Sequence, residues 1–200
     1  MVTQNSKKLG IKNADSLSDK LDGKTMVKLD NTKIRKLLTS HDFGHDAKKH
    51  GRQLEDLACY IFENIPGFTL EARNLYDKYS GLETDLIFWN DQTRSGLYFL
   101  PPIIPIECKN WSTPVAGIDL SWFAGKLRNK ALRFGIVFAR SGITGNESEG
   151  RDGYGAIQQI LHDGCQMIVI TGEDLENITD TDQIVELLKQ KFCNLGIGPR

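Results

Sequence analysis

Apolar residues along this chain switch repeatedly between two spacings, and this alternation limits the possible folds more than any other feature. Helical spacing, with apolar residues three or four positions apart, recurs in the segments 46–64, 118–134, 154–163 and 182–192. Short apolar runs typical of strands lie at 68–75, 83–89, 103–109, 135–139 and 165–171. This order predicts one α/β domain, built around a mixed sheet of about five strands that helices flank.

The N-terminal part of the chain is more basic than the rest. Residues 1–52 carry 12 Lys and Arg against 6 Asp and Glu, whereas the whole chain has a net charge of −1. Residues 26–38 have the pattern of a short helix or of a strand that covers the domain. We predict a flexible basic arm over residues 1–40 and a folded domain over residues 41–200. A solvated leader and an arm that touches a polyanion both fit this charge.

Cysteine spacing and hydropathy exclude several classes of protein. The cysteines Cys59, Cys108, Cys165 and Cys193 form no CxxC pair, which argues against a zinc knuckle and against a secreted disulfide scaffold. No apolar stretch approaches the roughly 20 residues that a membrane span needs. The N-terminus also lacks the apolar core of a secretory signal. These features predict a cytoplasmic protein without membrane contact.

Two of the predicted strands carry carboxylates beside apolar residues. Asp85 lies in the second strand, and Glu107 and Lys109 lie at the end of the third. Because alternate residues of a strand share a face, Glu107 and Lys109 project together and Cys108 points away. If the two strands pair, Asp85 lies beside Glu107. Two such carboxylates can hold Mg²⁺, with a lysine close to the bound water or phosphate. A structural ion pair at a sheet edge is the alternative for Glu107 and Lys109.

These residues stand in a longer pattern. The sequence IPIECKNWSTPVAG follows ETDLIFW, and a helix GRQLEDLACYIF with Gly51 and Glu55 comes before both. The later stretch GCQMIVITGEDL completes it. Over about residues 44–178 the chain resembles the PD-(D/E)xK nuclease superfamily, and more closely its Mrr-like, type IV restriction endonuclease-like branch. One departure is that Thr84, and not proline, precedes Asp85.

The resemblance implies a restriction-endonuclease-like three-layer fold and a Mg²⁺-dependent endodeoxyribonuclease, with Mn²⁺ as an alternative metal. It implies that Asp85 and Glu107 are metal ligands and that Lys109 orients or activates the water. Glu55 is implied as an accessory catalytic acid; a solvated acid on a helix face is the alternative. DNA is the implied partner, and a role in restriction or defence follows from the resemblance alone.

Basic residues on the predicted helices are candidates for contact with a nucleic acid backbone. Lys126, Lys130 and Arg133 follow helical spacing within residues 118–134, and Arg52 lies near Glu55. A solvated helix face explains the same spacing equally well. In the same helix, we expect Trp122 to lie in the core.

Two other functions remain open from the sequence. One is a catalytically silent, nuclease-like domain that binds nucleic acid or a protein. The other is a nuclease that acts in DNA repair or resolves junctions. Cleavage of both DNA strands would require a homodimer or two sequential nicks, and a separate recognition or motor subunit is compatible with the sequence.

Overall fold

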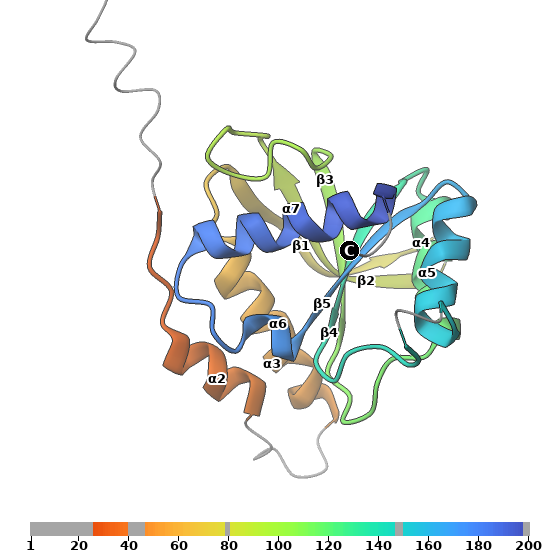
Figure 1. Cartoon of the computed structure of the whole chain (residues 1–200), viewed down its shortest axis with the longest axis horizontal. Helices are drawn as coiled ribbons and strands as arrows, with labels where there is room; N and C mark the ends of the chain where they lie inside the picture. Colours follow the sequence, from red (N-terminus) through yellow and green to blue (C-terminus); the bar gives the residue numbers. More distant parts are fainter. Residues whose placement is uncertain (1–25, 40–46, 79–80, 147–149, 198–200) are drawn as a thin grey trace, which may run out of the picture.

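The computed structural model of the protein describes residues 26–39, 47–78, 81–146 and 150–197, with the backbone alone for residues 47–51. Its strands are β1 (Phe68–Asp77), β2 (Leu82–Asn90), β3 (Ile103–Lys109), β4 (Phe134–Ala139) and β5 (Gln166–Thr171). Its helices are α2 (Asn31–Thr39), α3 (Ala47–Phe62), α4 (Gly117–Asn129), α5 (Asp152–His162), α6 (Gly172–Leu175) and α7 (Thr181–Ile197). The predicted α/β class and the mixed sheet of five strands between helices are confirmed (Figure 1).

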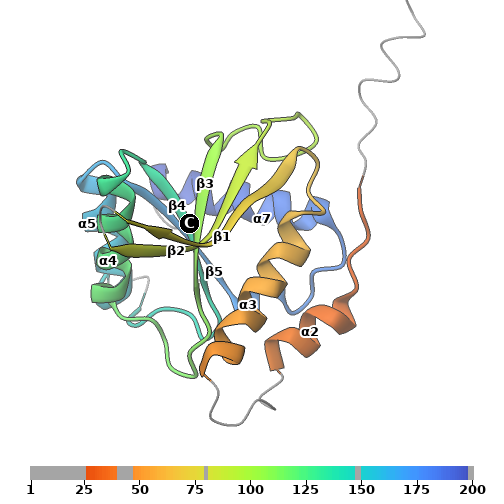
Figure 2. The same ribbon diagram turned by 180° about the vertical axis from the view of Figure 1, so that it is seen from behind.

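The strands lie in the sheet in the same order as in the chain, β1-β2-β3-β4-β5. The pairs β1–β2 and β2–β3 are antiparallel, whereas β3–β4 and β4–β5 are parallel. This difference follows from the connections, because a parallel neighbour requires a long crossover. Helices α4 and α5 form the two crossovers. They lie together at the end of the molecule opposite α2 and α3 (Figures 1 and 2).

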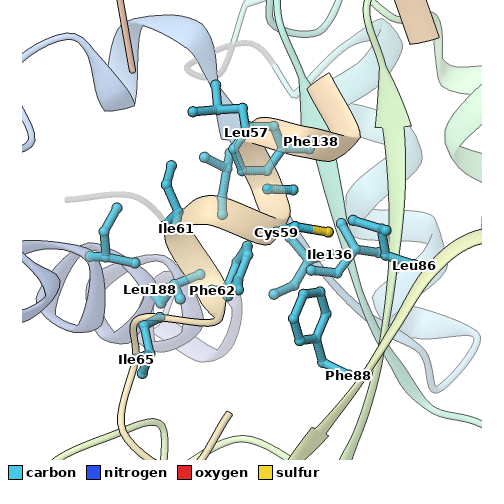
Figure 3. Packing of buried hydrophobic residues seen from close by; sticks show 14 of the residues in the cluster. Leu57, Cys59, Ile61, Phe62, Ile65, Leu86, Phe88, Ile136, Phe138 and Leu188 are labelled. Carbon is cyan, nitrogen blue, oxygen red and sulfur yellow. The ribbon is translucent and has the colours of Figure 1, made fainter. Parts of the chain in front are cut away.

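Two apolar cores cover the two faces of the sheet. The larger core joins one face to α2, α3 and α7, and Phe62 of α3 lies at its centre. The Phe62 ring lies 5.5 Å from the ring of Phe68 and 5.6 Å from that of Phe88, measured between centroids. Figure 3 shows Phe62 and other α3 side chains of this core, together with Phe88 of β2 and Leu188 of α7. The smaller core joins the opposite face to α4 and α5. The sheet therefore lies between two layers of helices.

The segment from Met26 to Thr39 belongs to the folded domain, which corrects the predicted arm over residues 1–40. Helix α2 places Ile34 and Leu38 in the larger core. Asn31 Nδ2 donates to the carbonyl of Ile178 at 2.9 Å, which ties this helix to the C-terminal half. The prediction of a flexible arm over residues 1–25 lies outside the described residues.

The helix predicted over residues 118–134 is shorter than expected. Helix α4 ends at Asn129, and Ala131 takes a left-handed backbone conformation with a φ of 55°. Phe134 then begins β4. The prediction that Trp122 lies in the core is wrong, because its side chain is 61 % exposed. An indole on the outer side of an amphipathic helix satisfies the helical spacing without being buried.

None of the helices that the structure describes combines the length and the apolar character that crossing a membrane requires.

Candidate active site

The ladder between β2 and β3 ends where Leu86 lies opposite Ile106. Beyond this pair, β2 continues beside β1, and β3 continues beside β4. The next residue is Asp85 on β2 and Glu107 on β3. The two carboxylates therefore lie where the strands separate, at a point that we call the fork.

Strand alternation turns both carboxylates toward the sheet face that α4 covers. On β2, Leu86 belongs to the larger core, so the adjacent Asp85 points to the opposite face. On β3, Ile106 belongs to the same core, and Glu107 reaches Lys126 of α4. The alternation predicted from the sequence thus places the two acids on one face.

Two lysines neutralise the carboxylate of Glu107, which is only 4 % exposed. Lys126 Nζ of α4 donates to both oxygens, at 2.9 Å to Oε1 and 2.8 Å to Oε2. Lys109 Nζ donates to Oε1 alone, at 3.0 Å. A buried carboxylate is tolerated only when it is paired and hydrogen-bonded, so this double contact explains how Glu107 is kept inside the fold.

Asp85 has a weaker set of partners. The backbone N–H of Cys108 donates to its Oδ2 at 2.7 Å. Among the described residues, Asp85 forms no direct ion pair. Burial, and next the negative charge of Glu107, raises the pKa of Asp85 to about 6, although the Cys108 N–H and the charge of Lys126 oppose this shift. Two adjacent, partly buried carboxylates of this kind attract a cation.

Cys108 lies between the two predicted catalytic residues on β3, and its side chain packs against the larger core. Burial raises the pKa of the Cys108 thiol well above its usual range. The thiol therefore stays protonated and acts as an apolar side chain. This outcome agrees with the strand alternation predicted from the sequence.

Glu55 approaches the fork from the α3 side of the sheet. Its side chain is buried, which excludes the alternative of a solvated acid. Arg73 of β1 donates from Nε to Glu55 Oε2 at 2.7 Å, and Asn74 Nδ2 donates to the same oxygen at 3.4 Å. The negative charge of Glu55 contributes the smallest of the effects that raise the pKa of Asp85. Glu55 is thus near the fork and already paired.

Arg73 is a residue of this region that the sequence did not single out. Besides Glu55, it contacts Asp56 at 2.7 Å and the carbonyl of Arg52 at 3.1 Å. The one hint in the sequence is the Glu55–Asp56 pair, which requires a cation if it faces the sheet. The strand that supplies the cation depends on how α3 lies across the sheet.

The structure separates the residues predicted to bind nucleic acid. Lys126 contacts Glu107 and is not part of a solvated stripe, and Lys130 Nζ donates to the Thr84 hydroxyl at 3.2 Å. Both therefore lie at the fork. Arg133 follows the end of α4 and extends toward Gly164, away from the fork. Arg52 is exposed on α3. The predicted common face of Lys126, Lys130 and Arg133 is therefore wrong, because α4 ends before Arg133.

Trp111 lies just beyond β3, beside Lys109. The Lys109 ammonium lies 5.1 Å from the centroid of the Trp111 ring, within the range of a cation–π contact. The Trp111 carbonyl accepts a hydrogen bond from the Ser141 hydroxyl at 2.6 Å, which anchors the backbone there. The exposed Trp111 indole thus packs against the Lys109 ammonium on its solvent side.

The two carboxylates of the fork are suitable ligands for a hard divalent cation. Within the part of the chain that the structure describes, no three His, Cys, Asp or Glu side chains are close enough to hold a metal together. Mg²⁺ does not need such a cage, since it is commonly held by one or two carboxylates, waters and substrate phosphates. Asp85 and Glu107 offer oxygen atoms of the kind that such a site would use, and Asp85 lacks a direct ionic partner among the described residues.

No protein-family model matches the sequence, and no curated protein matches it either.

Proposed function

We propose that this protein is a metal-dependent endonuclease that hydrolyses phosphodiester bonds in DNA, with a restriction-endonuclease-like fold related to the Mrr-like branch of the PD-(D/E)xK nucleases. The observation that supports the proposal best is the fork, where Asp85 and Glu107 lie on one face and Lys109 contacts Glu107 at 3.0 Å. This is the grouping of two acids and a lysine that the sequence pattern implies.

Each residue of the fork has a distinct part in the proposed chemistry. Asp85 and Glu107 would hold the divalent cation, which when bound supplies a water of lowered pKa and stabilises charge on the phosphate. Lys109 holds its ammonium beside Glu107 with 22 % of its side chain exposed, so that it can donate to a water or to a phosphate oxygen. Preorganised donors of this kind stabilise the negative charge that builds up during hydrolysis.

The surroundings of the fork favour an anionic polymer as substrate. Lys109, Lys126 and Lys130 place three ammonium groups on or next to the two carboxylates. Lysines at such a position bind phosphates without reading the base sequence. The proposal therefore includes DNA binding but no sequence preference, and restriction or defence remains the biological role that we propose from the resemblance.

The test is nicking of supercoiled plasmid by the full chain in Mg²⁺, Mn²⁺ or EDTA. We expect cleavage in either metal and none in EDTA. Lys109→Ala and Asp85→Asn should each lower the rate by at least about 100-fold, because each removes a group that acts on the reacting phosphate or its water. Lys189→Ala, an exposed lysine on α7, is the matched control and should leave the rate unchanged.

The other functions appear as distinct results of this experiment. If the wild type binds DNA but does not cleave it in any metal, the protein is a silent nuclease-like binding domain. If it cleaves branched or damaged DNA in preference to plain or modified duplex, the repair or junction-resolving function replaces restriction. Metal-dependent nicking that survives both Lys109→Ala and Asp85→Asn would contradict the assignment of the site.

A further inference from the structure

Glu107 binds two lysines, and they hold it in different ways. Lys126 bridges the two carboxylate oxygens at 2.9 and 2.8 Å, whereas Lys109 contacts one oxygen at 3.0 Å. The Lys126 side chain is also the less exposed of the two, at 15 %. An ammonium group that spans both oxygens occupies the side of the carboxylate where a cation binds most strongly.

Lys126 also acts on the second carboxylate of the fork. Asp85 accepts a hydrogen bond from the backbone N–H of Cys108, the residue next to Glu107, at 2.7 Å. Lys126 holds Glu107 through both carboxylate oxygens at this same point of the fork. Its ammonium therefore lies close enough to both acids to serve as their shared counter-charge. A divalent cation bound by Asp85 and Glu107 would occupy the same region as this ammonium. The two cannot stay there together, because like charges this close repel strongly.

We propose that, without metal, the Lys126 ammonium occupies the position of the divalent cation between Asp85 and Glu107. When the cation binds, Lys126 leaves this position and becomes free to bind a phosphate of the substrate. The inference rests on the proposed function, because it assumes that the fork takes a divalent cation. The flexible stem of Lys126 allows this movement, since a lysine is a point charge on four rotatable bonds.

The location of Lys126 on α4 fits such an exchange. It lies one turn before Lys130, which already reaches across to β2 at Thr84. When released from Glu107, Lys126 would lie beside Lys130 at the opening of the fork. The metal and the nucleic acid would then bind cooperatively, since each favours the state in which Lys126 is free.

The first test measures Mn²⁺ binding to the full chain without DNA, by the loss of the electron paramagnetic resonance signal of free Mn²⁺. Removing the resident positive charge should tighten binding, so Lys126→Gln should bind Mn²⁺ about tenfold more tightly than the wild type. Lys126→Arg, which keeps the charge, should stay within about threefold of the wild type. Lys109→Gln should tighten binding less than Lys126→Gln, because Lys109 contacts one oxygen only.

A second test uses the wild-type chain and so does not depend on the folding of a variant. Lysine labelling by reductive methylation, read by mass spectrometry, should show slow modification of Lys126 in EDTA and faster modification in Mn²⁺. Lys189 on α7 serves as an internal reference whose labelling should not change.

A third measurement follows the released ammonium to the substrate. In Mn²⁺, the affinity for duplex DNA should depend less steeply on salt concentration for Lys126→Gln than for the wild type, by about one phosphate contact. The oligonucleotides are checked after the measurement to verify that they are intact. In EDTA, the two proteins should have the same salt dependence, because Lys126 then stays on Glu107.

These experiments separate this inference from the proposed function. If the wild type binds Mn²⁺, and Asp85→Asn abolishes that binding, the metal site stands. Equal or weaker Mn²⁺ binding by Lys126→Gln, or unchanged labelling of Lys126, would then overturn the exchange alone. If neither the wild type nor Lys126→Gln binds Mn²⁺, both proposals fail.

Discussion

Asp85 is held where its charge is unfavourable. It is partly buried next to Glu107, and its pKa rises from the usual 3.8 to about 6. The native protein therefore binds more protons than the unfolded chain between these two values. The contribution of Asp85 to the free energy of unfolding is greatest at low pH and decreases as the pH rises through this window.

Replacing Asp85 with Asn should stabilise the protein near neutral pH. The amide can still accept the hydrogen bond from Cys108 N–H but carries no charge beside Glu107. We expect the free energy of unfolding to rise by about 2 kcal/mol at pH 7.5 in EDTA, and the gain to disappear near pH 4. Urea denaturation at both pH values measures this difference. A gain that is the same at both pH values would show that ionisation is not its cause.

Strand alternation was enough to predict that Glu107 and Lys109 share a face, because this property depends only on neighbouring residues. The partners of these residues depend on distant parts of the chain. Lys126 comes from another element, and its spacing in the sequence fitted either a contact with a nucleic acid backbone or a solvated helix face. Arg73 had no local signal, because its contact with Glu55 exists only where α3 crosses β1.

At the scale of elements, the close packing of α4 on β4 brings Lys126 to Glu107. Gly135 of β4 makes this approach possible, since a Cβ at this position would lie 2.8 Å from Phe123 and 2.9 Å from Leu127. Both contacts are shorter than real Cβ contacts allow. A side chain larger than glycine would therefore push the helix away from the strand and from the fork.

Two glycine substitutions should have opposite effects. Gly135→Ala should lower the free energy of unfolding by about 1–3 kcal/mol through overpacking. Gly125→Ala, within α4, should raise it by about 0.5–1 kcal/mol, because a Cβ there meets open space and alanine favours the helix. Urea denaturation of the two variants checks this pair. Equal effects of the two substitutions would contradict the packing described here.

At the scale of the whole molecule, backbone hydrogen bonds join the first described residues of the chain to its C-terminal part. Leu29 N–H donates to the carbonyl of Thr179 at 2.8 Å, and Thr181 N–H donates to that of Val27 at 3.0 Å. Helix α2 then inserts Ile34 into the core that α3, α7 and the sheet share. Because this core is continuous, we expect the domain to unfold as one unit.

Ile34→Ala should therefore weaken the entire domain and not only α2. We expect a loss of about 2–4 kcal/mol from the cavity and the lost burial. The transitions seen by circular dichroism and by tryptophan fluorescence should shift together. Lys36→Ala, at an exposed position of the same helix, should change the stability by less than about 0.5 kcal/mol. Separate transitions for Ile34→Ala would mean that α2 unfolds independently.

The sequence by itself determined the class of the fold, the five strands and the positions of most helices, because apolar spacing reports which side of each element is buried. It also placed Glu107 and Lys109 on one face. Only the tertiary structure decided where the sheet divides, which cation holds Glu107, that Trp122 is exposed and that α2 belongs to the core. Each of these depends on contacts between residues far apart in the chain, about which local periodicity carries no information.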